Sequence, residues 1–303
     1  MNHSFVNISV FLDPASVWCW GSEPVLRKIE TYYKDRVQIR FIMGGLIKDI
    51  RHFYDAKNEV GGDITRSNRN LAKHWLESSK KHGMPVQTDG IALFSEDYPS
   101  TWPLNKAYKA AELQDAGLAR KFLRRMMEAV FAEAVPLNRL EKLVILAGET
   151  GLNVEQFVEY MADGPAERAF YKDLQIMKAF GVRLFPSFLI QFGEKKTVLR
   201  GYQPFSNFKR AIDEVSDGEV TGEPERATEK NILAFIKKYG RVAPVEIRES
   251  FDLTDRQLEA VLKGLEAQKR IVMTPAGNGF FVSEPNRSAE NGQESKQVHH
   301  KHD

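Results

Sequence analysis

The sequence has few of the features that mark secreted, membrane and nucleic-acid-binding proteins. Its 303 residues include one cysteine, Cys19, so no disulfide can form within the chain. No apolar run approaches the roughly 18 residues that a membrane span needs, and the first residues do not resemble a secretory signal peptide. The 43 basic and 41 acidic residues leave a net charge of +2, which is too small to attract nucleic acid or an acidic membrane. We therefore expect a cytoplasmic protein.

The order of predicted elements indicates an α/β domain that a helical block interrupts. Residues 5–12 alternate and are rich in β-branched and aromatic side chains, as in a strand. A helix is expected from residue 16 to 35, kinked at Pro24, and a second strand at 36–45. Helical patterns then dominate residues 62–178. Two more strands and a closing helix follow at 187–193, 196–202 and 204–218.

A second module follows a polar, turn-rich linker. It shows three helical patterns and a hairpin with a Gly-Asn-Gly tip, an order typical of a winged helix. A DNA-binding module would concentrate positive charge on its third helix and hairpin. Here the third helix mixes Asp255, Glu259 and Glu266 with its basic residues, and the hairpin tip has no Lys or Arg. The module is therefore expected to bind protein or to form a homodimer, and nucleic acid is an unlikely partner.

Two separated stretches carry a resemblance to a known family. FLDPASVWCWGSEP, at 11–24, resembles the active-site segment of DsbA-like thioredoxin-fold proteins, particularly the FrnE-type branch with its pattern D-P-x-C-x-W-C-W-G. GVRLFPSFLI, at 181–190, resembles the later segment in which an apolar residue, here Phe185, precedes a cis-proline, here Pro186. This resemblance covers about residues 4–215 and implies a thioredoxin fold with a helical insertion.

The resemblance and the element order together predict the division of the chain. The thioredoxin-like domain is expected at 1–50 and 176–215, with the helical insertion at 51–175. A linker at 216–227, a winged-helix-like domain at 228–283 and a disordered tail at 284–303 complete the chain, since the tail has almost no apolar residue.

The chain differs from the family at the position of the first active-site cysteine. Alignment on the flanking residues places Ser16 where the first, nucleophilic cysteine belongs, so C-x-x-C has become S-x-x-C. Dithiol exchange needs one thiolate to attack and a second thiol to resolve the mixed disulfide, and Ser16 cannot attack. Cys19 corresponds to the second cysteine, which is largely buried in this fold. Trp18 and Trp20 suggest further cover, so the thiol is expected to be slow, and packing alone accounts for it.

Three hypotheses remain for Ser16. Its hydroxyl can cap the helix that follows. It can also activate glutathione as a cosubstrate, because Phe11, Asp13 and Ser16 match the outline F-Y-D-x-x-S-P-Y-S of kappa-class glutathione transferases and 2-hydroxychromene-2-carboxylate isomerases. That resemblance implies that the serine hydroxyl donates to the glutathione sulfur. Against it, Val17 replaces the proline, and residues 201–204 lack the charged pair of G-x-D-R. Thirdly, the chain can be a catalytically silent member that only binds.

The segment Phe185-Pro186 gives a second basis for binding. A cis-proline can simply serve a turn. Next to the start of the active-site helix it leaves the backbone of Phe185 available to an extended peptide or glutathione. Ser16 and Cys19 are thus the predicted catalytic residues, and Trp18, Phe185 and Pro186 are the predicted thiol- or substrate-binding residues.

Two functions follow from these residues. One is a thiol-disulfide oxidoreductase-family enzyme with an altered site, using glutathione through Ser16. The other is a catalytically degenerate adaptor that holds partners in the cis-proline groove and on the winged helix. No bound cofactor or metal is expected, because His52, His74 and His82 do not have the spacing of metal ligands.

Overall fold

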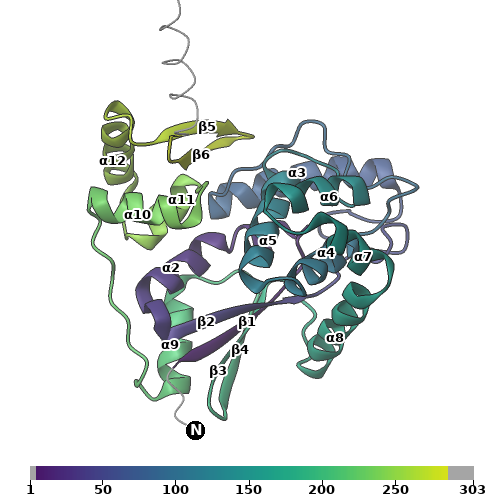
Figure 1. Cartoon of the computed structure of the whole chain (residues 1–303), viewed down its shortest axis with the longest axis horizontal. Coiled ribbons are helices and arrows are strands. Elements are labelled where there is room, and N and C mark those ends of the chain that lie inside the picture. The colour runs from purple at the N-terminus through teal and green to yellow at the C-terminus, as the bar shows by residue number, and fades with distance from the viewer. Residues whose placement is uncertain (1–4, 286–303) are drawn as a thin grey trace, which may run out of the picture.

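A four-stranded sheet lies at the base of the molecule, with strand order β2-β1-β3-β4 (Figure 1). The computed structural model describes residues 5–285. β1 (Val6–Leu12) pairs in parallel with β2 (Val37–Met43) and antiparallel with β3 (Ser187–Phe192). β3 in turn pairs antiparallel with β4 (Lys195–Arg200). The predicted disordered tail lies, from residue 286 onward, outside the described residues.

Two helices connect β1 with β2. α1 (Val17–Trp20) ends at Gly21, and α2 (Glu23–Tyr33) begins anew, followed by the short 3-10 helix η1 (Lys34–Arg36). Pro24 lies in the first turn of α2, where a missing N–H costs no helical hydrogen bond. The prediction of one helix kinked at Pro24 is therefore wrong, because the break precedes the proline.

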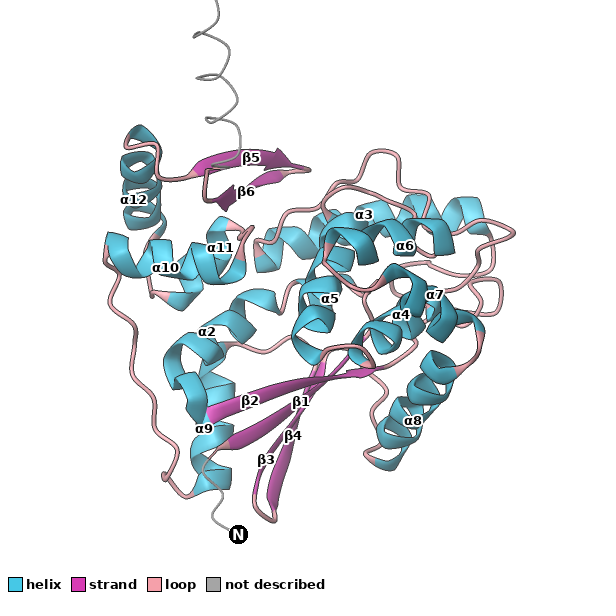
Figure 2. Ribbon diagram, viewed as in Figure 1, coloured by secondary structure: helices cyan, strands magenta, loops and turns pink. Residues whose placement is uncertain are grey.

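A block of helices separates β2 from β3 and covers one side of the molecule (Figure 2). Asp63, Asp115 and Asn153 each cap one of these helices, accepting a hydrogen bond from the backbone N–H three residues later. α9 (Phe205–Ser216) follows β4 and packs on the sheet. The element order is the one the sequence predicts, while the exact domain boundaries stay a prediction. The block contains α3 (Ile64–His82), α4 (Trp102–Glu112), α5 (Ala116–Phe131), α6 (Leu140–Glu149), α7 (Val154–Ala162) and α8 (Pro165–Ala179).

The C-terminal module, residues 229–283, has the three helices and the hairpin that its sequence predicts. A backbone bridge between Val242 and Val282 adds a third short strand segment to the hairpin. The module has an apolar core of its own, which includes Ile232, Leu262 and Leu265. Its elements are α10 (Glu229–Tyr239), α11 (Pro244–Ser250), α12 (Asp255–Ala267), β5 (Val272–Ala276) and β6 (Gly279–Ser283).

The tip of this hairpin is fixed to the loop that follows α3. The Asn278 side chain accepts a hydrogen bond from the Val86 N–H at 2.8 Å and donates one to the Ser79 hydroxyl at 3.0 Å. The Asn278 N–H donates to the Val86 carbonyl at 3.0 Å. Gly277 has φ +52, and a Cβ there would lie 2.1 Å from the same carbonyl oxygen. Only glycine fits this contact, so the hairpin tip is bonded to the body rather than free.

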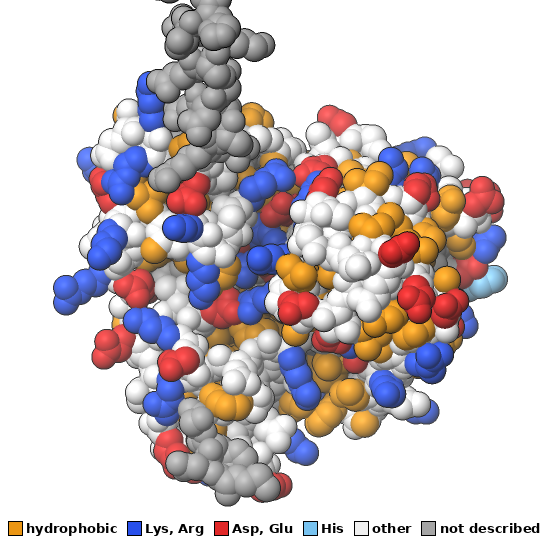
Figure 3. Space-filling model, in the orientation of Figure 1, with side chains coloured by type: hydrophobic (Ala, Val, Ile, Leu, Met, Phe, Trp, Pro, Cys, Tyr) orange, Lys and Arg blue, Asp and Glu red, His pale blue; other side chains and the backbone are white. Residues whose placement is uncertain are grey.

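A buried group of charges joins α11 to the rest of the molecule. Glu246 is fully buried, and both of its carboxylate oxygens accept hydrogen bonds from the Arg124 guanidinium, at 2.9 and 2.8 Å. Arg27 approaches the same carboxylate at 3.5 Å and pairs with Glu23 at 2.8 Å. We call Glu23, Arg27, Arg124, Glu128 and Glu246 the interface cluster. In the space-filling view, basic and acidic side chains lie along the seam between the C-terminal module and the helical block (Figure 3).

Candidate functional site

Asp13 fixes the loop that carries the predicted site. It is completely buried, and its carboxylate accepts hydrogen bonds from the Ala15 and Leu46 N–H groups, the Thr101 hydroxyl and the Asn105 amide, all at 2.7–2.9 Å. Burial raises the pKa of this carboxyl, and the four hydrogen bonds lower it by less. Asp13 thereby ties the segment after β1 to the segment after β2 and to the start of α4.

Ser16 occupies the N-cap position of α1, but its hydroxyl makes no capping hydrogen bond. The hypothesis of a hydroxyl cap is therefore wrong. The hydroxyl interacts instead with the thiol of Cys19, which is 3% exposed. Burial raises the pKa of Cys19 from 9.0 to about 12, and the Ser16 hydroxyl offsets only part of that rise. At neutral pH the thiolate is roughly a thousandfold scarcer than for an ordinary cysteine.

The two tryptophans beside Cys19 point to different regions. Trp20 is fully buried, donates to the Pro85 carbonyl at 2.9 Å and packs edge-on against Phe281 of the C-terminal module. Trp18 is half-buried, and its ring lies 5.7 Å from that of Tyr202 and 6.3 Å from that of His74. Trp20 therefore belongs to the interface with the C-terminal module, and Trp18 to the predicted site.

The peptide bond between Phe185 and Pro186 is cis, as the sequence predicts. Pro186 is buried, and its carbonyl accepts a hydrogen bond from the Gly201 N–H at 2.8 Å. Leu184, two residues before Pro186, is 53% exposed, and Phe185 is half-buried. We call Trp18, Leu184, Phe185 and Tyr202 the active-site face. These side chains give an apolar surface beside the start of α1.

A cavity of about 410 Å³ opens beside Ser16. Its wall includes residues 15–18, the loop between β2 and α3, one side of α3 and residues 183–185. Ser16, Trp18 and Phe185 therefore line one cavity, which we call the site cavity. Cys19 and Pro186 are not part of its wall, so the structure brings together only three of the five predicted site residues.

One side of α3 forms a wall that sequence reasoning did not assign to the site. Leu71, His74, Trp75, Ser78 and Lys81 all line the site cavity, at the spacing that places residues on one helix face. Burial lowers the pKa of His74, so its imidazole is neutral at pH 7. The amphipathic spacing of these residues predicts that this face of α3 turns toward the protein interior. The sequence alone does not tell which other elements the face lies against.

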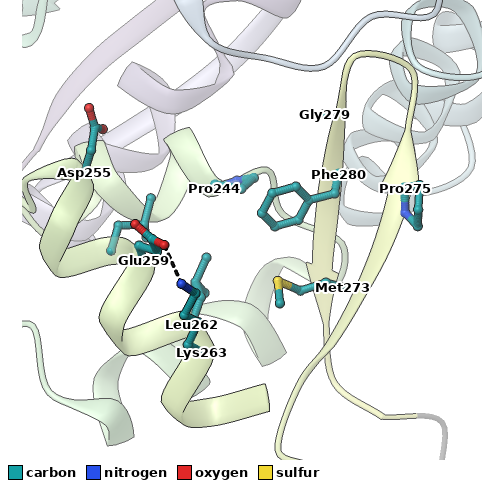
Figure 4. A pocket seen from close by; sticks show the side chains of 10 residues that line it. Pro244, Asp255, Glu259, Leu262, Lys263, Met273, Pro275, Gly279 and Phe280 are labelled. Carbon is teal, nitrogen blue, oxygen red and sulfur yellow. Dashed lines mark hydrogen bonds and ion pairs between the residues drawn. The ribbon is translucent and has the colours of Figure 1, made fainter. Parts of the chain in front are cut away.

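A second cavity, of about 620 Å³, lies between α12 and the hairpin of the C-terminal module (Figure 4). Leu262 on the helix, and Met273 and Phe280 on the strands, give it an apolar lining. An ion pair between Glu259 and Lys263, 2.6 Å long, lies at its edge. We call this cavity the C-terminal groove.

Comparison with known proteins identifies the family of this chain. A family model described as thioredoxin matches residues 9–210. The chain belongs to this thioredoxin family. The ClpXP adapter protein SpxH of Halalkalibacterium halodurans is 28% identical, over 91% of this chain and 88% of that protein. A match of that extent includes most of the C-terminal module.

Solved structures support the same fold. A putative protein disulfide isomerase from Nitrosomonas europaea aligns with a TM-score of 0.57 at 18% identity, over 70% of this chain and 96% of its own. A probable DsbA oxidoreductase from Streptomyces coelicolor aligns with a TM-score of 0.55 at 18% identity, over 73% and 94%. The predicted thioredoxin fold with a DsbA-like helical insertion is confirmed. The FrnE-type resemblance and the winged-helix designation stay predictions. Among residues 5–285, no helix has the length and apolar character to cross a membrane.

Proposed function

We propose that this chain is a ClpXP adaptor that binds a partner protein and carries out no thiol exchange. The observation that carries this proposal is the state of Cys19. It is the only cysteine of the chain, it is buried, and burial raises its pKa to about 12. With Ser16 in the attacking position, the cycle of attack and resolution has no first step.

An adaptor must hold two proteins at once, and the molecule offers two separate surfaces for that purpose. The active-site face exposes Leu184 and Tyr202, and the C-terminal groove has an apolar lining. The interface cluster and the bonded hairpin tip keep the C-terminal module in a fixed position relative to the thioredoxin domain. The similarity to relatives named as ClpXP adapters, over nine-tenths of the chain, supports the proposal.

The test measures binding to purified ClpXP together with thiol chemistry. We expect saturable binding of the wild type to immobilised ClpXP, unchanged in Cys19→Ala. In insulin reduction with dithiothreitol, the wild type is expected to show no rate above background. The matched control is Ser16→Cys, which restores C-x-x-C and is expected to gain activity. Absence of ClpXP binding would overturn the proposal, and so would a wild-type reductase rate that is lost in Cys19→Ser.

A second candidate function is the activation of glutathione by Ser16. Two observations favour this function. The Ser16 hydroxyl makes no capping hydrogen bond, and Ser16 lines the site cavity. A hydroxyl placed there can donate to the sulfur of a bound thiol and favour its thiolate. Calorimetry with glutathione is expected to show binding that Ser16→Ala weakens. No heat of binding up to millimolar glutathione rejects this candidate.

A further inference from the structure

Exposed aliphatic side chains are concentrated on two neighbouring helices, α6 and α7. Single exposed aliphatic residues are common on soluble proteins, but a group of them often marks a surface that another molecule covers. Four of the seven that are exposed within residues 5–285 fall between residues 140 and 158. The seven are Leu113, Leu140, Ile145, Val154, Val158, Leu184 and Val272.

Three of these side chains form a connected apolar line across the two helices. Ile145 and Gly148 are three residues apart and therefore lie on the same face of α6. Gly148 in turn lies against α7, since a Cβ at this glycine would be 3.5 Å from the Val154 side chain. Val158 follows Val154 by four residues and extends the line along α7. We call Ile145, Gly148, Val154 and Val158 the α6–α7 patch.

The segment around this patch is acidic, although the chain as a whole is not. Residues 140–163 contain five acidic residues and one basic residue, Lys142, which gives a net charge of −4 in a chain of +2. Glu149 is paired with Arg125 at 3.0 Å. The other four acidic residues are exposed and have no cation partner among residues 5–285. They are Glu141, Glu155, Glu159 and Asp163.

The unpaired carboxylates border the apolar side chains. Glu141 precedes Ile145 by four residues, so the two lie on one face of α6. On α7, each valine of the patch is followed directly by a glutamate, Glu155 or Glu159. In the space-filling view, apolar side chains gather over α6 and α7, with acidic side chains beside them (Figure 3). A molecule that covers the patch therefore needs apolar side chains, and it needs Lys or Arg to balance the carboxylates.

The other apolar surfaces do not select the charge of a partner in this way. At the C-terminal groove, Glu259 is paired with Lys263 at 2.6 Å, and Asp255 with Arg248 at 3.0 Å. The wall of the site cavity mixes acidic and basic side chains. At the α6–α7 patch, by contrast, the unpaired charge has one dominant sign.

We propose that the α6–α7 patch is a docking surface for a basic amphipathic helix of a partner protein. The apolar side of such a helix covers the patch, and its Lys or Arg side chains face Glu141, Glu155 and Glu159. This surface goes beyond the adaptor function and does not depend on it.

The test measures binding of a labelled synthetic helix by fluorescence anisotropy. The probe has about 14 residues, roughly four helical turns, with Leu and Lys at helical spacing. One comparison peptide has Glu in place of Lys, and the other has Ser in place of Leu. The wild type is expected to bind the Leu-Lys peptide at least about tenfold more tightly than either comparison peptide. Its binding is expected to weaken as the salt concentration rises.

Two variants remove the two parts of the surface separately. Ile145→Ser removes the most exposed aliphatic side chain of the patch, and it is expected to weaken binding about fivefold. The triple variant Glu141→Gln, Glu155→Gln, Glu159→Gln removes the bordering charges. It is expected to weaken binding about tenfold at low salt and to reduce the dependence on salt. Both variants change exposed side chains, so circular dichroism is expected to show unchanged folding.

Matched controls change residues of the same type elsewhere on the chain. Val272→Ser removes an exposed aliphatic side chain of the C-terminal module. The triple variant Glu194→Gln, Glu223→Gln, Glu266→Gln makes the same change of net charge at exposed positions outside α6 and α7. Both controls are expected to bind the Leu-Lys peptide as tightly as the wild type.

Several results would overturn the proposal. The wild type could fail to bind the Leu-Lys peptide at about 100 μM, or it could bind a comparison peptide as tightly. A patch variant could keep the wild-type affinity, or a control could lose as much as its matched variant. A wild-type dimer in sedimentation that Ile145→Ser dissociates would also overturn it, because a second copy of the chain would then cover the patch. These measurements do not use ClpXP, so a failed adaptor assay and a failed peptide assay are separate results.

Discussion

Ser78 and Ser79 are neighbours on α3, yet they belong to two regions that bury polar groups in opposite ways. Ser79 donates to the Met84 carbonyl at 2.8 Å and accepts from Asn278 of the hairpin tip at 3.0 Å. Ser78 has no bonding partner among the described residues and lines the site cavity. Ser79 thus has two partners within the chain, one of them in the C-terminal module, whereas Ser78 is buried without one. Paired groups fix a geometry, so Ser79 helps to hold the hairpin tip in place and Ser78 does not.

The largest effect is expected from breaking the interface cluster with Glu246→Gln. This change removes a fully buried charge that bonds to Arg124 and Arg27, and it leaves both guanidinium groups poorly compensated. Loss of one partner of a buried ion pair costs about 3–5 kcal/mol, measured as the free energy of unfolding in urea. The matched control is Glu149→Gln, which removes a half-exposed partner of Arg125 and is expected to cost less than about 1 kcal/mol. Equal losses in the two variants would contradict the role of the cluster.

The next effect is a dependence of stability on pH that originates at His82, the last residue of α3. Burial lowers its pKa from 6.5 to about 4, so below pH 6.5 the unfolded chain takes up a proton that the folded chain does not. The free energy of unfolding therefore falls as pH falls from 6.5 to 4, by about 3 kcal/mol over the whole window.

The measurement is urea denaturation of wild type and His82→Asn at several pH values. An asparagine oxygen can replace the imidazole nitrogen that accepts from the Met84 N–H, and it does not titrate. In the variant, the free energy of unfolding is expected to fall less between pH 6.5 and pH 4 than in the wild type. If the two proteins lose stability equally over this range, His82 is not the source of the pH dependence.

A smaller loss of stability is expected for Ser79→Ala, and its comparison with Ser78→Ala tests the difference between the two serines. Ser79→Ala removes one hydrogen bond within α3 and its loop and one to the hairpin tip, and it is expected to cost about 1–2 kcal/mol. Thermal denaturation detects this loss as a lower midpoint. Asn278→Ala removes the other partner, so the double variant is expected to lose less than the sum of the single losses. Strict additivity would mean that the two side chains do not interact.

No loss of stability is expected for Ser78→Ala. The hydroxyl has no partner to lose, and its burial without a hydrogen bond carries a cost that the alanine removes. The free energy of unfolding is therefore expected to stay the same or to rise. A loss as large as that of Ser79→Ala would show that Ser78 is bonded in the free protein.

The sequence predicts the fold well because its signals are local and come in the right order. The DPASVWCWG segment, the LFP segment and the β-α-β, β-β-α pattern each depend on neighbouring residues. The burial of Cys19 follows in the same way from the position of the second cysteine in this fold. The division into domains, the catalytic assignments and the homodimer stay predictions.

The sites that the sequence does not reveal depend on contacts between distant segments. Glu23 and Arg27 have the spacing of an ordinary exposed ion pair on a helix, as do Arg124 and Glu128. Only the fold brings these two pairs together around Glu246, where burial alone would raise the pKa of Glu23 but the guanidinium groups of Arg27 and Arg124 lower it by more. Ser78 is similar, since its sequence context is that of any helical serine.

The position of Trp20 has a consequence for the synthesis of the protein on the ribosome. Its ring contacts Phe281, so part of its cover is made more than 250 residues after it. At the usual rate of about 5–20 residues per second, the C-terminal module needs roughly 3–11 s to be translated. During that time the thioredoxin domain and the helical block can already be folded, while the contacts of Trp20 with Phe281 and of Arg124 with Glu246 are not yet made. The last part of the chain to be made therefore completes the core that the first part began, and an interrupted translation product would lack these contacts.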